Sequence, residues 1–349
     1  MLQTRIDRNV EVVTCLLNLT ERGSLDWNTG ISSQPYRREV MQHFSHLKKH
    51  PAVLLTNQLH AQGFWWDAMI ELAVTCTVFP EAALTADLRN SRYVNAGEGD
   101  PAKGKKTLDE LLDLIDDFYI QAEFDDFYRA HQPLYDGIIR EVEAGLPDAA
   151  WLQLVTDYYG AGSDEDIQGF YLIPSPLSIG GNGFGPEVHR DGELEVYNVF
   201  APFRSVDAEE ASCGFDRPEQ LAKLAMHEFG HSFVNHALES PRHKGPITRF
   251  AALYAAERAT GQMSYEDWIC VAEHIIRACE IRIALVAGQP ESAARLLQHN
   301  IEQHAFHYLP AIVEALDDYE QNRSRYPSLS AFVPTLMQTL DAIAADQQN

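Results

Sequence analysis

The chain has 349 residues, of which 45% are hydrophobic and 22% charged, as is ordinary for a soluble globular protein of one or two domains. Acidic residues outnumber basic ones by 51 to 27, and the net charge of −24 argues against a nucleic-acid or anionic-membrane partner. The five cysteines are scattered without a CxxC pair, which argues against a disulfide framework and against a cysteine-based zinc site.

The N-terminal segment bears on the location of the protein. Its apolar stretch is interrupted by Glu11 and Asn18, and no clear small-residue cleavage site follows, so it makes a poor signal peptide. No apolar run in the sequence reaches the roughly 18 residues of a membrane span. We therefore expect a cytoplasmic protein, or an exported one if a leader precedes this segment in the natural chain.

The predicted elements form a helical first part, a short sheet and a helical last part. Helices are expected over residues 36–50, 51–62, 64–79 and 107–145, with a polar glycine-rich loop at 95–106 and a break near Pro133. Aromatic and β-branched residues at 165–203 predict a small sheet. Helical patterns return after Asp216. We expect an α+β fold, mostly α, with a helical N-terminal region at 1–150 and a second domain at 151–349.

The segment "HEFGH" lies inside a helix predicted over residues 216–238. His227 and His231 are four residues apart, so both imidazoles lie on one helix face and can reach one metal ion. Glu228 is turned about 100° from His227 and can take a proton from a coordinated water. Gly230, unfavourable in mid-helix, indicates the close approach of another backbone. The pattern predicts a catalytic zinc site; the alternative is a helix with two satisfied core histidines.

A catalytic zinc usually has three protein ligands. The metzincin pattern is excluded, because Gly and His do not stand three and six positions after His231. The remaining candidates are the carboxylates of Glu239, Glu257, Glu266, Glu273 and Glu280. We favour Glu273, in the middle of an apolar helix predicted over 264–287, with Arg277 one turn later to orient it. A plain i,i+4 salt bridge is the alternative for that pair, and Glu280 and Glu257 are the next candidates for the ligand.

Several segments resemble a known family. "HEFGHSFVNH", "WICVAEHIIRACEIRI" and "GFWWDAMIELAV" are similar to the bacterial zincin-like family catalogued as domain of unknown function 4932, and a looser similarity covers most of the chain. The resemblance implies a gluzincin-type metallopeptidase core with one zinc ion per chain, in which the small sheet packs on the HExxH helix. It also implies Glu273 as the third ligand, with Arg277 beside it. Members of the family are often exported.

Other residues are candidates for the rest of the site. Tyr308 and then His307 are candidates to stabilise the tetrahedral oxyanion, although core packing explains such residues equally well. Asn235 lies one turn after His231 and is a candidate to orient it.

A glycine-rich segment precedes the predicted strand "ELEVYNVF". Its residues Gly181, Asn182 and Gly183 are candidates for a substrate-binding edge, where a peptide is held by main-chain hydrogen bonds. A flexible turn is the alternative. No GK[ST] follows these glycines, so the segment does not predict a nucleotide site.

The expected function is zinc-dependent hydrolysis of a peptide or small protein. The metal lowers the pKa of a coordinated water toward about 7, and Glu228 carries its proton to the leaving amine. The alternative is a non-catalytic zinc-binding zincin scaffold that acts as a binding or interaction module. The presence of Glu228 favours the enzyme. A helical structural protein without metal ranks third.

Overall fold

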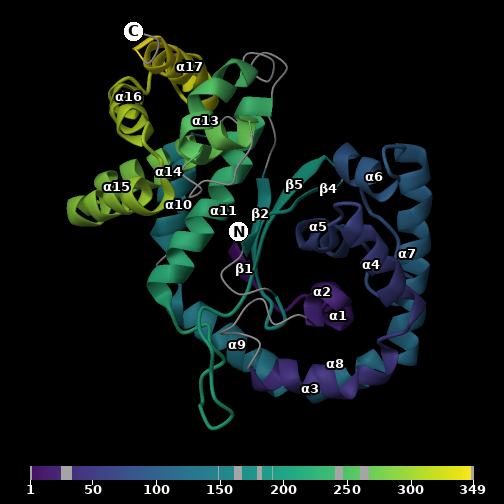
Figure 1. Ribbon diagram of the computed structural model, residues 1–349. Coiled ribbons are helices and arrows are strands. Elements are labelled where there is room, and N and C mark those ends of the chain that lie inside the picture. Colours follow the sequence, from purple (N-terminus) through teal and green to yellow (C-terminus); the bar gives the residue numbers. More distant parts are fainter. Residues whose placement is uncertain are drawn as a thin grey trace. The chain divides into compact units, whose positions relative to one another are not determined.

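The computed structural model describes residues 2–24, 34–147, 149–160, 167–178, 183–190, 192–239, 247–259 and 267–346. These residues form a mostly helical α+β chain with a small mixed sheet of five strands, shown in Figure 1, so the predicted α+β class is confirmed. Contacts divide the chain into two compact units. The first comprises Met1–Leu146 and Ile167–Ala225, and the second comprises Pro147–Asp166 and Met226–Asn349. A domain boundary near residue 150 stays a prediction.

Most helices of the first unit lie between its first strand, at residues 2–4, and the other four strands of its sheet. They are α1 (Arg8–Leu19), α2 (Glu21–Ser24), α3 (Pro35–His43), the 3-10 turn η1 (Ser45–Leu47), α4 (Pro51–Ala61), α5 (Trp66–Thr75), α6 (Asn90–Ala96), α7 (Pro101–Gln121), α8 (Phe124–Ala130) and α9 (Gln132–Gly145). The helix α1 is buried along almost its whole length and packs on α4 and α5. In turn α4 packs on α7, which runs along the outside of this unit in Figure 1.

Several boundaries in this helical region differ from the sequence expectation, since the helices expected over 36–50 and 64–79 end at His43 and Thr75. The loop expected at 95–106 is short, because the Asp100 carboxylate accepts hydrogen bonds from the backbone N–H groups of Ala102 and Lys103 and so caps α7. Pro101 suits the first turn of that helix. A further break separates α7 from α8, where Glu123 has a left-handed φ of 47°.

The sheet of the first unit combines parallel and antiparallel strands. Its members are β1 (Leu2–Thr4), β2 (Ile167–Pro174), β3 (Gly183–Phe184), β4 (Glu187–Arg190) and β5 (Glu193–Phe200). In the order β1-β2-β5 neighbours are parallel, whereas β3 and β4 pair antiparallel with β5. The central strands β2 and β5 are buried over most of their length, and the buried residues of β5 include the polar Glu195 and Asn198 among apolar ones. The strand β1 was not predicted.

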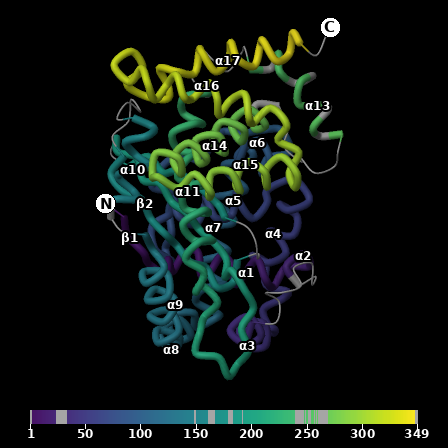
Figure 2. Tube along the Cα trace, turned by 90° about the vertical axis from the view of Figure 1, so that its left-hand side faces the viewer, coloured from purple at the N-terminus to yellow at the C-terminus, as the bar shows by residue number. Residues whose placement is uncertain are grey.

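The second unit is helical. It contains α10 (Ala149–Tyr159), the later part of α11 (Pro218–Glu239), the 3-10 turn η2 (Thr248–Phe250), α13 (Ala251–Ala259), α14 (Asp267–Val286), α15 (Pro290–His304), α16 (Leu309–Gln321) and α17 (Leu329–Asp346). The helix α14 is the centre of its core and packs on α10, α13, α15 and α16. Figure 2 shows α17, in yellow, along α16, and α16 packs on α14.

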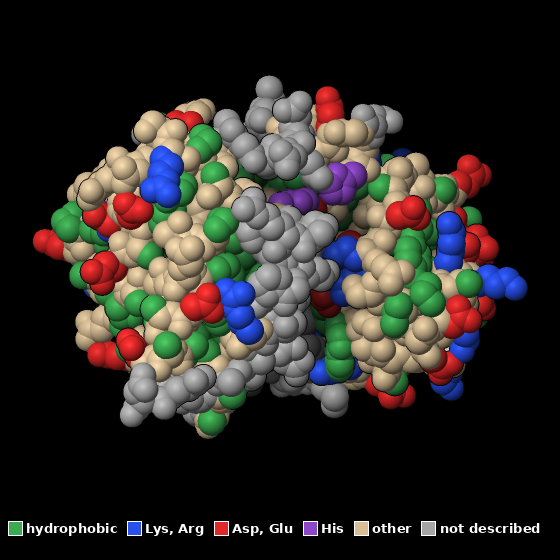
Figure 3. Space-filling view, turned by 90° about the horizontal axis from the view of Figure 1, so that it is seen from above, with side chains coloured by type: hydrophobic (Ala, Val, Ile, Leu, Met, Phe, Trp, Pro, Cys, Tyr) green, Lys and Arg blue, Asp and Glu red, His purple; other side chains and the backbone are tan. Residues whose placement is uncertain are grey.

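The surface of the described residues is mixed in character. Figure 3 shows acidic and basic side chains interspersed with hydrophobic ones, and histidine side chains visible on the same face. None of the helices in the described ranges is long and apolar enough to cross a membrane.

Candidate metal centre

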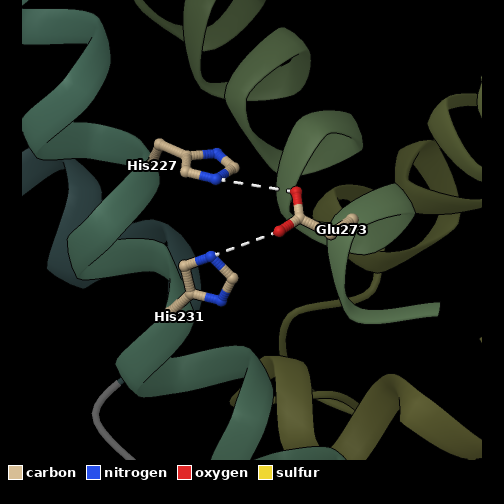
Figure 4. A group of neighbouring side chains, drawn as sticks. All are labelled: His227, His231 and Glu273. Atoms are coloured by element: carbon tan, nitrogen blue, oxygen red, sulfur yellow. Dashed lines mark ion pairs between the residues drawn. The ribbon is translucent and has the colours of Figure 1, made fainter. Parts of the chain in front are cut away.

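Two histidines of α11 form one side of the site. His227 and His231 lie one helical turn apart, and their ring centroids are 4.9 Å apart with nearly perpendicular planes. Figure 4 shows both rings projecting from α11 toward Glu273, which α14 supplies. The two imidazole side chains are 17% and 20% exposed, so they are accessible without being solvated all round.

Glu273 completes the group. Its Oε2 lies 3.6 Å from His227 Nε2, and its Oε1 lies 3.5 Å from His231 Nε2. One ligand atom from each of the three residues lies within 4.8 Å of the other two. The Glu273 side chain is 4% exposed, so the carboxylate comes from the buried face of α14. Among the described residues, this His-His-Glu group could hold a metal ion.

The two histidine–carboxylate separations are compatible with a tetrahedral metal. Ligand atoms at about 2.0–2.1 Å from a tetrahedral zinc are about 3.3 Å apart. The observed nitrogen–oxygen separations of 3.6 and 3.5 Å are close to that value. They are longer than good hydrogen bonds but lie within ion-pair distance, as the dashed lines in Figure 4 mark.

The outer atoms of both rings have oxygen partners. His227 Nδ1 lies 2.8 Å from Glu280 Oε1, and His231 Nδ1 lies 3.4 Å from Asn235 Oδ1. A neutral imidazole that donates its Nδ1 proton outward presents a lone pair at Nε2. Two such lone pairs and the Glu273 carboxylate then converge, and a cation between them would stabilise this arrangement.

Glu280 was predicted only as an alternative ligand, and its contact with His227 was missed. It lies seven residues after Glu273, about two turns along α14, and its side chain is 4% exposed. A carboxylate behind a ligating histidine fixes the tautomer and raises the basicity of the ring. The spacing of Glu273, Arg277 and Glu280 on one helix face was the available signal.

Burial and neighbouring charges shift the pKa values of His227 and Glu228. Burial lowers the pKa of His227, but the hydrogen bond and charge of Glu280 outweigh burial and leave this pKa raised. A metal must therefore displace a proton held more firmly than usual. Burial raises the pKa of Glu228; the imidazoles oppose this shift and the carboxylates of Glu273 and Glu280 add to it.

Arg277 contacts the Glu273 carboxylate, and its predicted role in orienting a ligand stays a prediction. Its Nη1 donates to Glu273 Oε2 at 2.5 Å and lies 3.4 Å from His227 Nδ1. The side chains of Arg277 and Glu273 are only 14% and 4% exposed, so the pair is not a salt bridge on a solvated face. The guanidinium also lies over the ring of Phe306, 4.5 Å from its centroid.

Gly230 makes room between helices of the second unit. A Cβ atom there would lie 2.9 Å from Tyr159 Oη and 3.2 Å from Ile276 Cγ2. Side chains of α10 and α14 therefore fill the space that the sequence assigned to an approaching backbone. Because Ile276 follows Glu273 by one turn of α14, this close approach brings the Glu273 carboxylate to the histidines.

The other predicted residues lie in varied surroundings. The Tyr308 hydroxyl donates to the carbonyl of Leu253 at 3.1 Å, and the side chain of His307 is exposed. Gly183 belongs to β3, at the end of the sheet order in the first unit. Gly181 and Asn182 lie outside the described residues, as does Glu266. The roles predicted for these residues in oxyanion stabilisation and substrate binding stay predictions.

Comparison with known proteins gives one match. The model of a family described as a domain of unknown function, DUF4932, matches residues 2–339. A search of curated proteins found no match, and neither did a search of solved structures.

Proposed function

Because the chain belongs to the DUF4932 family, whose description assigns no activity, we propose from the site itself that it is a zinc-dependent peptide hydrolase. The observation that carries the proposal is the convergence of His227, His231 and Glu273 beside the Glu228 carboxyl. Two imidazoles with one carboxylate are a ligand set of catalytic zinc, and they leave a coordination position open. The proposal includes a zincin-like core of gluzincin type.

Each residue has a part in the proposed hydrolysis. A zinc ion bound by the three ligands would supply Lewis acidity toward water and toward the scissile carbonyl. Glu228 accepts the proton of the attacking water and delivers it to the nitrogen of the leaving amine. Glu280 holds the ring of His227 through Nδ1, and Arg277 holds the carboxylate of Glu273.

The test combines metal content with activity. Elemental mass spectrometry should find about one zinc per chain in the wild type and much less in Glu273→Ala. Glu228→Gln should keep the zinc and lose about 10²- to 10⁴-fold of the hydrolysis of an unfolded protein substrate. Equal hydrolysis by wild type and Glu228→Gln would favour the non-catalytic scaffold. A wild type that takes up no transition metal would exclude both the zinc-dependent hydrolase and the non-catalytic zinc scaffold.

A further inference from the structure

A buried pair lies beside the third ligand and is not used by the proposed chemistry. Glu257 of α13 and His274 of α14 both have fully buried side chains. His274 Nε2 lies 3.2 Å from each oxygen of the Glu257 carboxylate, and its Nδ1 lies 2.8 Å from the carbonyl oxygen of Cys270. Both ring nitrogens thus face oxygen atoms within a fully buried contact. Removing one partner would leave an uncompensated polar group.

Glu257 also binds the turn between α15 and α16. Its Oε1 accepts a hydrogen bond from the backbone N–H of His307 at 2.6 Å and lies 3.4 Å from the nitrogen of Tyr308. In this turn Ala305 has a left-handed φ of 58°, a conformation that costs free energy in a residue other than glycine. The carboxylate therefore holds a strained turn against α13 and α14.

The turn presents Phe306 to the metal site. Phe306 is 1% exposed. The centroid of its ring lies 4.6 Å from the centroid of the His274 ring and 4.5 Å from the guanidinium carbon of Arg277. Arg277 donates to the carboxylate of Glu273. A continuous series of contacts thus leads from Glu257 through the turn, Phe306 and Arg277 to the third ligand.

We propose that Glu257 is a positioning residue for the metal centre. By holding the turn, it keeps Phe306 under Arg277, and Arg277 in turn keeps the Glu273 carboxylate directed at the histidines. Preorganisation of this kind lowers the cost of binding the ion, because the carboxylate does not have to be ordered on binding. This inference rests on the proposed metal site and assigns Glu257 no contact with substrate.

The test measures metal binding, not hydrolysis. Zinc affinity would be measured by competition with a chromophoric chelator, and ligand geometry by the absorption spectrum of the cobalt-loaded protein. Glu257→Gln should bind zinc about tenfold more weakly and shift the cobalt spectrum. Phe306→Leu, which leaves Glu257 in place, should weaken zinc binding about threefold.

Tyr319→Phe is the matched control. Tyr319 is fully buried in the same unit, and its hydroxyl donates to the carbonyl of Tyr158 at 2.6 Å. Its loss should lower the melting temperature without changing the zinc affinity or the cobalt spectrum. A merely structural role for Glu257 would give Glu257→Gln this same result.

The outcomes separate this inference from the proposed function. A folded Glu257→Gln with zinc affinity within twofold of wild type and an unchanged cobalt spectrum would overturn the positioning role and leave the metal site intact. If that variant does not fold, unchanged values in Phe306→Leu would overturn it equally. A wild type that binds neither zinc nor cobalt would defeat the proposed function first, and this inference with it.

Discussion

Oε1 of the Glu280 carboxylate lies 2.8 Å from Nδ1 of His227. The two residues are 53 positions apart in the sequence and belong to different helices, α14 and α11. The contact turns Nε2 of His227 toward Glu273, which lies two turns earlier on the same helix as Glu280. One helix thus supplies both the carboxylate of the proposed metal site and the carboxylate that contacts His227 from the other side.

Glu280→Gln should weaken zinc binding about 10- to 100-fold, because the amide keeps the shape but not the charge behind the ring. Competition with a chromophoric chelator measures the change. Glu291→Gln is the control, since Glu291 is an exposed carboxylate of α15 in the same unit. Equal affinities in the two variants would show that Glu280 does not orient the ligand.

Gly230→Ala should lower the free energy of unfolding by about 1–3 kcal/mol, although alanine favours helix by about 1 kcal/mol. The added methyl group would meet the buried Tyr159 hydroxyl at 2.9 Å. Denaturant unfolding measures the loss. Adding Tyr159→Phe to Gly230→Ala should recover part of it by removing the oxygen, and no recovery would mean that the hydroxyl is not the obstacle.

Zinc should stabilise the folded protein against heat. Ligand that binds only the folded state adds about 2.7 kcal/mol at a free concentration 100 times Kd. Scanning calorimetry with and without zinc should therefore show a higher Tm in the wild type and no shift in Glu273→Ala. An equal shift in both proteins would place the stabilising zinc elsewhere.

The stability of the first unit should depend on Glu11. Burial raises the pKa of this carboxyl from 4.5 to about 8, against the opposing effect of the hydrogen bond donated by the Tyr36 hydroxyl at 2.7 Å. The folded state therefore retains a proton that the unfolded state has lost. This contribution to stability is complete below pH 4.5 and is lost as the pH rises to about 8.

Unfolding by urea between pH 5 and pH 9 measures the effect. The slope due to Glu11 is at most about −1.4 kcal/mol per pH unit. Glu11→Gln has no proton to lose, so its unfolding free energy should fall less over this range and exceed that of the wild type above pH 8. Parallel curves for the two proteins would contradict the assignment.

Local patterns were enough to predict much of the site. The helix around His227 and His231 follows from its own periodicity, and two histidines four residues apart share a face in any α-helix. The pairing of Arg277 with Glu273 is likewise local, because one helical turn separates them. The mostly helical α+β class could be predicted for the same reason.

Non-local contacts were not predictable in this way. The strand β1 has only three residues, so its own sequence carries no distinct signal. It pairs with β2, and each residue of β1 lies 168 positions before its partner in β2. The short loop before α7 depended on a single capping carboxylate, Asp100. Glu280 was one of several acidic residues on later segments until α14 placed it behind His227.

By itself the sequence determined which residues share a helix face, because that depends only on the pitch of the helix. It therefore determined the two histidines, the adjacent Glu228 and the face that carries Glu273. Only the tertiary structure decided which carboxylate reaches the histidines and which lies behind them. That choice depends on how closely α14 approaches α11 at Gly230 and on the rotation of α14 about its axis. Both are set by packing between segments far apart in the chain, which no local spacing encodes.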